Sequence, residues 1–205
     1  DTDAAVNKKL KAALAHKLKT GAFPAGYAYA LQEMGTPSRF LAEYLDLRGP
    51  QYTVSTACTS SGKAFQSARQ LLSLGLADAV VVGGADSLCR LTLNGFSALE
   101  STSPELCQPF SVNRRGINIG EAAALFLLSR DEAELRLAGI GESADAHHMS
   151  APEPDGRGAE VAMRMALAEA GLTPADIAYV NLHGTATKLN DAMEAKAMAR
   201  VFGLT

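Results

Sequence analysis

The stretch Gln51–Gly62, with the sequence QYTVSTACTSSG, constrains the fold of this chain more than any other. Residues Tyr52–Ala57 form a short run of β-forming side chains that is typical of a buried strand. Apolar side chains then recur at helical spacing over residues 64–72, and Gly75 follows where the C-terminus of a helix favours glycine. A cysteine, Cys58, is therefore predicted at an elbow between a strand and a helix.

The position of Cys58 suits a nucleophile. We expect it in the first turn of the helix, where unpaired N–H groups and the positive end of the helix dipole favour the thiolate over the thiol. The alternative is a structural thiol, because most single cysteines pack as small apolar side chains. The elbow favours function, but position alone leaves the two interpretations nearly balanced.

The composition of the 205-residue chain argues against several function classes. Hydrophobic residues make up 47% and charged residues 20%, with a net charge of −3, so we expect no nucleic-acid partner. The apolar runs are too short to cross a membrane, so no membrane partner is expected either. The three cysteines, at positions 58, 89 and 107, have no metal-ligand spacing and are odd in number. We therefore expect neither a metal site nor a disulfide framework, and we expect structural roles for Cys89 and Cys107. The expected location is the reducing cytoplasm.

The order of the elements predicts an α/β fold. Helices are predicted over residues 1–20 and 36–45. The helix after Cys58 leads into an apolar run, Ala79–Val82, that ends in two glycines. A strand, a helix and a strand in this order predict a parallel pair with a right-handed crossover. Residues 88–117 are aperiodic, as in segments that line a site, and another β run follows at Asn118–Leu128.

The charged segment Asp131–Arg136 is the predicted boundary between two halves, residues 1–130 and 131–205. The first half carries the cysteine and the second carries a histidine, His183. The predicted elements of the second half are a glycine-rich strand at Leu137–Ser143, a helix at about 159–170, a buried strand at Ile177–Leu182 and a helix from Asp191.

His183 follows its predicted strand directly, as Cys58 follows the first one. Sites in open α/β sheets form beyond the carboxyl ends of strands, so we expect the two residues to face one cleft. His183 opens the sequence HGTAT, in which Gly184 allows close backbone approach and Thr185 and Thr187 offer hydroxyls. We favour a functional histidine over a capping or packing one.

Two polar pairs are assigned to structure. Asp191 and Glu194 are three residues apart at the start of a helix, which predicts a capping box with Asp191 as the N-cap. The adjacent His147 and His148 point to opposite sides of an extended segment, so they do not predict a metal site.

Several motifs in collinear order together resemble the β-ketoacyl-acyl-carrier-protein synthases of the thiolase superfamily. They are TACTSS at Thr56–Ser61, GGAD at Gly83–Asp86, GEAA at Gly120–Ala123, DAHHMSAPEPDG at Asp145–Gly156, and HGTAT at His183–Thr187 with Asn190, Asp191 and Glu194. The resemblance covers the chain from about Pro50 to its end. It implies a thiolase-like αβαβα layered fold of two similar halves, of which this chain covers only part.

The resemblance also implies carbon–carbon bond formation by decarboxylative Claisen condensation, without a cofactor. Cys58 resembles the nucleophile that takes the acyl chain as a thioester, and its N–H would contribute to the oxyanion hole. His183 resembles the first of two histidines that act on the malonyl thioester and stabilise its enolate. Thr185 and Thr187 would bind substrate, with Asp191 and Glu194 as structural support. The implied partners are an acyl carrier protein bearing acyl or malonyl groups and a second subunit, in a homodimer or a ketosynthase-like heterodimer.

The departures from the family pattern define the alternatives. The second histidine, in a Gly-His motif, and a lysine are expected beyond Thr205, so the chain is interpreted as incomplete. Ser111 and Ile117 stand where many members have an acidic and an aromatic residue. This favours a specialised type II synthase of fatty acid or polyketide biosynthesis, such as those of aryl polyene pathways.

Two other functions stay open. One is a non-condensing subunit, like a chain-length factor, that shapes the pocket of a partner synthase. Such subunits typically lack the nucleophile, so Cys58 counts against this reading. The other is an acyltransferase of the same superfamily that does not condense.

Overall fold

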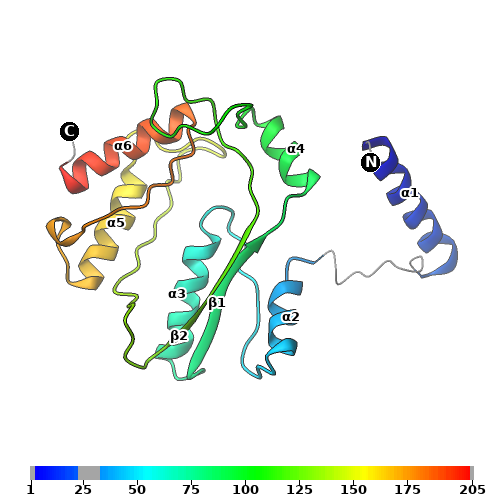
Figure 1. The fold of residues 1–205 in the computed structure, drawn as a ribbon, viewed down its shortest axis with the longest axis horizontal. Coiled ribbons are helices and arrows are strands. Elements are labelled where there is room, and N and C mark those ends of the chain that lie inside the picture. The colour runs from blue at the N-terminus through cyan, green and yellow to red at the C-terminus, as the bar shows by residue number, and fades with distance from the viewer. Residues whose placement is uncertain (1–2, 23–32, 204–205) are drawn as a thin grey trace. The chain divides into compact units, whose positions relative to one another are not determined.

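The computed structural model describes residues 3–22 and 33–203, in two compact units, Asp1–Thr53 and Val54–Thr205. The helices of the first unit are α1 (Asp3–Thr20) and α2 (Thr36–Tyr44) (Figure 1). Both lie where the apolar spacing predicts them, although residues 1 and 2 of the first predicted helix lie outside the described residues. Every candidate catalytic residue belongs to the second unit, which is described below by itself.

The second unit mixes helices and strands, and the predicted α/β class is confirmed. Its elements are α3 (Ser60–Ser73), β1 (Ala79–Asp86), α4 (Arg90–Ala98), β2 (Ala122–Ser129), α5 (Arg157–Ala170), a 3-10 turn at Pro174–Asp176 and α6 (Lys188–Phe202). Gly75, just beyond α3, has a φ of 67°, so it ends the helix in the left-handed conformation that its position predicts.

The strands do not pair as the sequence predicts. β1 pairs with β2 in an antiparallel ladder, with Ala79 opposite Ser129 and Asp86 opposite Ala122. The predicted parallel partner, Tyr52–Ala57, forms no ladder in the described structure and contributes only the isolated bridge between Thr56 and Cys58. A β-forming run indicates an extended backbone, but it does not determine which segment supplies the hydrogen-bond partner.

The same reason applies to the predicted strands Leu137–Ser143 and Ile177–Leu182. Neither is assigned to a strand in the described structure. Both predictions of regular strand structure are therefore wrong. The second segment is not fully buried either, since the side chain of Tyr179 is exposed.

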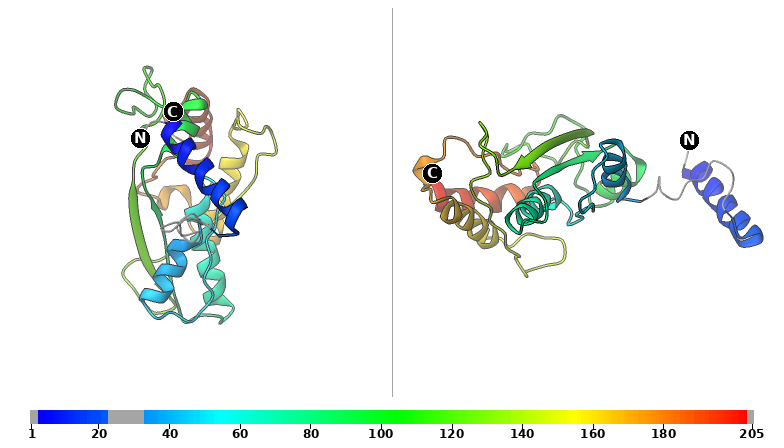
Figure 2. Two further views of the ribbon diagram at one scale, coloured as in Figure 1. Left: turned by 90° about the vertical axis from the view of Figure 1, so that its right-hand side faces the viewer. Right: turned by 90° about the horizontal axis from the view of Figure 1, so that it is seen from below.

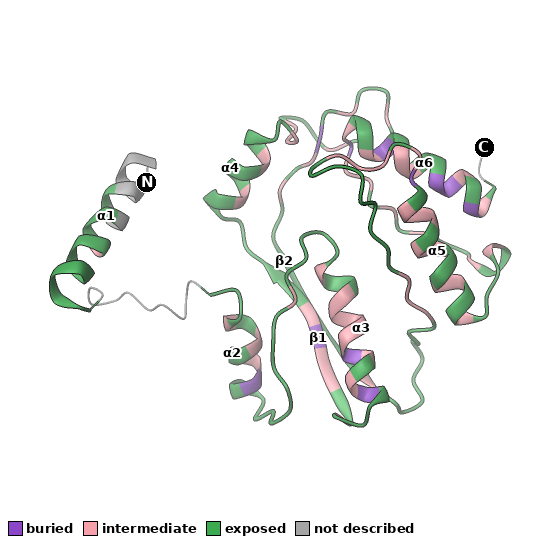
Figure 3. Cartoon of the chain, turned by 180° about the vertical axis from the view of Figure 1, so that it is seen from behind, coloured by how far each residue is buried: buried purple, intermediate pink, exposed green. Residues whose placement is uncertain are grey.

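The α3 helix packs on the two-stranded sheet through small and branched side chains (Figure 1). Ala68 and Leu72 of α3 and Val82 of β1 are buried (Figure 3). Phe65 of α3 meets Phe126 of β2 with ring centroids 5.5 Å apart and the rings tilted, an arrangement that aromatic pairs favour. This small core holds α3 on the sheet, and the cysteine elbow directly precedes that helix.

A second core joins α5 to α6, which lie side by side (Figure 2). Ala197, Met198 and Val201 of α6 are buried in it. At the edge, Glu160 of α5 accepts hydrogen bonds from Arg200 at 2.5 Å and Arg164 at 2.9 Å. The hydrogen bond from Arg200, and to a smaller extent the one from Arg164, lowers the pKa of the Glu160 carboxyl. The contact with Arg200 joins α5 to α6 and stabilises the position of α6, which carries part of the candidate site.

Residues 139–142 connect α3 to α5. Glu169 of α5 accepts a hydrogen bond from Arg69 of α3 at 2.7 Å and another from the N–H of Ile140 at 2.6 Å. Lys63 of α3 forms an ion pair with Glu142. Residues from the two predicted halves are therefore linked by charged contacts in the second unit.

We expect Gly141→Ala to destabilise this junction strongly. A Cβ atom at Gly141 would lie 1.8 Å from the carbonyl oxygen of Ala162 and 2.8 Å from the N atom of Ala166, both in the backbone of α5. Helix backbone cannot yield as a flexible side chain can, so the expected loss is about 2 to 3 kcal/mol of unfolding free energy. Gly120→Ala is the matched control, because a Cβ there meets nothing within 4 Å.

Thermal unfolding of the two variants of the full-length protein measures the difference. The expected result is a clearly lower Tm for Gly141→Ala and a nearly unchanged Tm for Gly120→Ala. Equal Tm values for the two variants would show that the close packing of residue 141 on α5 is not needed for stability.

Candidate active site

Cys58 lies at an elbow that hydroxyl side chains hold in place. Ser60 Oγ accepts the N–H of Thr56 at 2.9 Å and donates to the carbonyl of Ala57 at 2.6 Å. Thr59 Oγ1 donates to the carbonyl of Thr56 at 2.8 Å. Ala57 has a φ of 54°, a left-handed conformation that costs free energy in a non-glycine residue and persists only where surrounding contacts enforce it.

The thiol itself is exposed. Thr59 is the N-cap of α3, so Cys58 stands one residue before the cap rather than in the first helical turn as predicted. The left-handed bend lies at Ala57, and Cys58 and Thr59 continue the turn before the helix begins at Ser60. A solvent-accessible thiol on a constrained elbow beside a helix N-terminus is well placed to act as a nucleophile.

The end of β1 packs against this elbow. A Cβ atom at Gly84, in the GGAD motif, would lie 3.4 Å from Oγ of Ser61 in the first turn of α3. The glycine thus permits close contact between strand and helix. The motif, which the sequence singled out, therefore supports the position of the cysteine.

The segment His183–Thr187, called here the histidine turn, is bound through its backbone to Glu194 of α6. Glu194 Oε1 accepts the N–H of His183 at 2.7 Å, and Oε2 accepts the N–H of Gly184 at 2.9 Å. Gly184 has a φ of 53°. Both carboxylate oxygens are thus used to hold the backbone, while the imidazole of His183 stays exposed.

Asp191 is not the N-cap that the sequence predicts. The cap of α6 is Thr187, the helix begins at Lys188, and Asp191 lies in its first turn with 2% of its surface exposed. Its Oδ2 accepts the N–H of Phe110 at 2.7 Å. The capping-box interpretation is wrong because the two carboxylates bind N–H groups outside the helix, on two different segments. The predicted supporting role of the pair stays a prediction.

The hydroxyls of Thr185 and Thr187 form a hydrogen bond with each other at 2.8 Å. Both residues are half-buried beside His183. Their mutual bond fixes the two side chains within the histidine turn, and their role in substrate binding stays a prediction.

The histidine turn also contacts the segment Pro109–Gly116, called here the arginine loop. A Cβ atom at Gly184 would lie 3.3 Å from Cβ of Pro109 and 3.7 Å from Cε2 of Phe110. The N–H of Gly116 donates to the carbonyl of Ala186 at 2.9 Å. The sequence predicted that this aperiodic region lines a site, but it did not single out Phe110 or Gly116.

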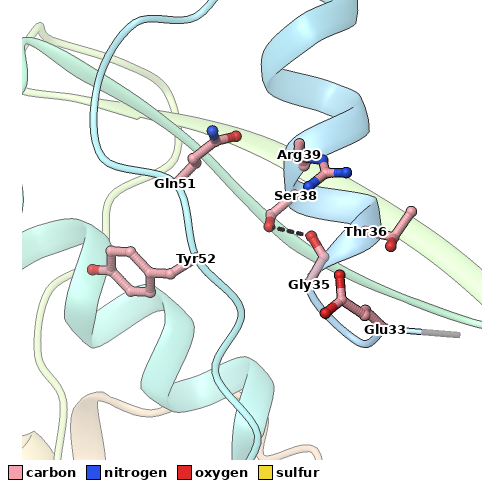
Figure 4. Close-up of a pocket in the computed structure, with 7 residues that line it drawn as sticks. All are labelled: Glu33, Gly35, Thr36, Ser38, Arg39, Gln51 and Tyr52. Carbon is pink, nitrogen blue, oxygen red and sulfur yellow. Dashed lines mark hydrogen bonds between the residues drawn. The ribbon is translucent and has the colours of Figure 1, made fainter. Parts of the chain in front are cut away.

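The predicted site residues thus form two groups. His183, Thr185, Thr187, Asp191 and Glu194 gather at the start of α6, and Cys58 stands before α3. Within the described structure, no hydrogen bond or ion pair joins Cys58 to His183, so the predicted common cleft stays a prediction. A pocket of about 210 Å³ lies in the first unit and is lined by none of these residues (Figure 4).

The other cysteines and histidines have different surroundings. Cys89 is exposed at the N-cap of α4 rather than packed as a structural thiol. Its hydrogen bond with Thr92, 3.2 Å long, lowers the pKa of the thiol. Nδ1 of His148 accepts the N–H groups of Ser150 and Ala151.

Among the described residues, no group of three His, Cys, Asp or Glu side chains gathers as metal ligands, and no helix has the length and apolarity to cross a membrane.

Comparison with known proteins identifies the family. A model described as "Beta-ketoacyl synthase, N-terminal domain" matches residues 11–134, and one described as "Beta-ketoacyl synthase, C-terminal domain" matches residues 134–205. The chain belongs to the β-ketoacyl synthase family. The resemblance read from the sequence motifs is thereby confirmed.

Relatives and solved structures agree with this assignment. Nodulation protein E of Rhizobium meliloti is 42% identical over 168 residues, which cover 78% of this chain and 41% of that protein. The 3-oxoacyl-[acyl-carrier-protein] synthase 2 of Rhizobium meliloti (strain 1021) is 41% identical over 173 residues, covering 77% of this chain and 41% of that protein. The match therefore spans well under half the length of these curated relatives.

Among solved structures, a chain of the complex described as "Ketosynthase (ApeO) in Complex with its Chain Length Factor (ApeC) from Xenorhabdus doucetiae" matches with a TM-score of 0.86 and 51% identity, over 96% of this chain and 49% of that chain. A β-ketoacyl synthase from Burkholderia phymatum STM815 matches with a TM-score of 0.78 and 31% identity, over 93% of this chain and 50% of that chain. The chain has part of the thiolase-like α/β fold of ketosynthases, as the motifs implied.

The double hydrogen bond of Glu194 leads to a prediction. Glu194→Gln keeps one acceptor oxygen but turns an NH₂ group toward the second backbone N–H, so the histidine turn loses a charge-assisted bond. We expect the amide hydrogens of His183 and Gly184, which Glu194 holds, to exchange with deuterium about tenfold faster in the full-length variant. The control Glu134→Gln changes an exposed carboxylate in the segment after β2 and should leave the exchange rates unchanged. Equal rates in the two variants would contradict a supporting role for Glu194.

Proposed function

We propose that this chain carries the acyl-accepting cysteine and one active-site histidine of a β-ketoacyl-acyl-carrier-protein synthase. The observation that carries the proposal is the exposed thiol of Cys58 on the constrained elbow before α3. Relatives named 3-oxoacyl-[acyl-carrier-protein] synthase 2 support it. A thioester exchange needs a sulfur nucleophile that a carrier-bound acyl group can reach, and the exposed side chain of Cys58 meets this requirement.

In the first half-reaction, the Cys58 thiolate attacks the thioester carbonyl of an acyl carrier protein. The carrier thiolate leaves, and the acyl group stays as a thioester on Sγ. The negative oxygen of the tetrahedral intermediate needs a preorganised donor, and the backbone N–H of Cys58 is the proposed one.

In the second half-reaction, a malonyl-carrier thioester loses carbon dioxide. The electron pair of the broken carbon–carbon bond becomes an enolate, which attacks the acyl carbonyl and expels the Cys58 thiolate. His183 is the proposed donor to the enolate oxygen, with Thr185 and Thr187 as proposed substrate contacts beside it. The fixed backbone of the histidine turn serves this role, because donors that need no rearrangement stabilise a developing charge best.

The proposed protein works in the cytoplasm with an acyl carrier protein and a second ketosynthase-type subunit. The 51% identity to a chain of a complex between a ketosynthase and its chain length factor supports a specialised type II synthase, as do Ser111 and Ile117. An acyl-carrier protein is part of another matching structure, with a TM-score of 0.77 and 27% identity. The two family models, which meet at residue 134, support the proposed halves 1–130 and 131–205.

A turnover assay tests the proposal. The full-length protein with its partner subunit is incubated with an acyl-carrier and a malonyl-carrier thioester, and 3-oxoacyl-carrier and carbon dioxide are quantified. Equal amounts of the two products are expected. Acyl transfer without condensation would favour the acyltransferase alternative, and no acyl transfer at all would favour the chain-length-factor-like one.

A further inference from the structure

We propose that Arg114 is a positioning residue for the decarboxylating half of the site, an inference that rests on the proposed function. Sequence motifs did not single out this side chain, and it lies outside the predicted catalytic group. It joins the arginine loop to the start of α6, where His183 and its supporting residues gather.

The guanidinium of Arg114 contacts three backbone carbonyls. Its Nη1 donates to Ser111 at 3.0 Å, Nη2 donates to Lys188 at 3.2 Å, and Nε donates to Thr187 at 3.4 Å. Two of these carbonyls belong to the last residue of the histidine turn and the first of α6. The planar fork of arginine can bridge separate acceptors in this way, whereas a lysine ammonium is a single point of attachment.

A buried carboxylate lies next to this guanidinium. Arg114 Nε is 3.9 Å from Asp191 Oδ2, and the two side chains are 22% and 1% exposed. The same Oδ2 accepts the N–H of Phe110. Because a buried charge without compensation is costly, Arg114 and Asp191 depend on each other for their positions. Together they attach both ends of the arginine loop to α6.

The backbone at this junction is strained on both sides. Phe110 in the loop and Ala186 in the histidine turn have φ values of 63° and 55°, and Ala186 is fully buried. Left-handed non-glycine residues persist only where surrounding contacts over-determine them. The contacts of Arg114 and Asp191 are placed to do this, so their loss should let the histidine turn relax.

The arginine loop also leads toward the cysteine half. Six residues after Gly116 the chain enters β2, which pairs with β1, and the end of β1 packs against the first turn of α3. Arg114 therefore connects the histidine turn, through the loop and the sheet, to the helix that follows Cys58. Its removal should disturb the turn directly and the cysteine elbow only remotely.

The test compares Arg114→Met, Arg114→Lys and the control Arg115→Met in the full-length protein. The side chain of Arg115 is 64% exposed and pairs at 3.5 Å with Glu105, itself 67% exposed, so its loss should cost little. For Arg114→Met we expect kcat of malonyl-thioester decarboxylation to fall about 10- to 100-fold, with KM changed less than about threefold. Arg114→Lys should recover part of the loss, and Arg115→Met should match wild type.

The rate of Cys58 acylation and the Tm, measured on the same samples, separate positioning from general stability. If Arg114 acts by positioning the histidine turn, the rate of Cys58 acylation in Arg114→Met stays within about twofold of wild type. Arg114→Lys and wild type then have similar Tm values. A loss of both half-reactions in proportion to Tm overturns the inference, as does wild-type decarboxylation in Arg114→Met. If wild-type protein does not acylate Cys58, the proposed function fails, and the inference fails with it.

Discussion

Replacing Cys58 with alanine is expected to abolish acyl transfer and condensation, with a loss of about 10⁴-fold or more. The methyl group of alanine cannot form a thioester. The neighbouring hydroxyls of Thr59 and Ser60 bond to the backbone of the elbow, and that of Thr56 accepts the hydroxyl of Thr59. The fold should tolerate the change, because the Cys58 side chain is exposed.

Intact-protein mass spectrometry of the full-length protein with an acyl-carrier thioester measures this directly. Wild type should gain one acyl group and Cys58→Ala none. Cys89→Ala is the informative control, because Cys89 is exposed and the Thr92 hydrogen bond lowers the pKa of its thiol. That variant should be acylated like wild type. An adduct that persists in Cys58→Ala, or that maps to Cys89 or Cys107, would assign the nucleophile elsewhere.

Helices were the part of the fold that the sequence predicts best. Their apolar spacing and end signals are local, so α3 ends at Ser73, two residues before Gly75, which adopts the left-handed backbone that the pattern predicts. The extended runs were predicted less well. A β-forming run such as Tyr52–Ala57 specifies an extended backbone, whereas pairing depends on residues far away in the chain. The antiparallel β1–β2 pair illustrates this, since more than thirty residues separate the two strands.

The candidate site shows the same division between local and distant information. The cysteine elbow could be predicted because strand-like residues, a cysteine and a helical pattern follow one another within a dozen positions. Asp191 and Glu194 fit a local capping pattern, but the structure uses Asp191 for Phe110 and Glu194 for His183 and Gly184. Spacing along a helix cannot reveal an acceptor's partner on a distant loop.

Arg114 was missed for a related reason. Its neighbour Arg115 has the same side chain and stands in the same loop, yet one guanidinium bridges three carbonyls and the other lies in an exposed ion pair. The sequence carries no signal that separates the two, because the difference is made by the start of α6, more than seventy residues later.

Replacing His183 with alanine is expected to separate the two half-reactions. The imidazole is the proposed donor to the malonyl-derived enolate, so its loss should lower malonyl-thioester decarboxylation by roughly 10²- to 10⁴-fold. Acylation of Cys58 should survive largely intact, because the cysteine elbow is built by its own hydroxyl network and no hydrogen bond from His183 reaches it in the described structure.

Two measurements on one sample decide the assignment of His183: carbon dioxide release from a malonyl-carrier thioester, and acyl loading by intact-protein mass spectrometry. His148→Ala is the matched control, since in the described part of the chain its imidazole accepts the N–H groups of Ser150 and Ala151 in its own loop. It should leave both rates near wild type. If His183→Ala instead abolished acylation and spared decarboxylation, the histidine would serve the cysteine rather than the enolate. The proposed role of His183 in the malonyl half-reaction would then be wrong.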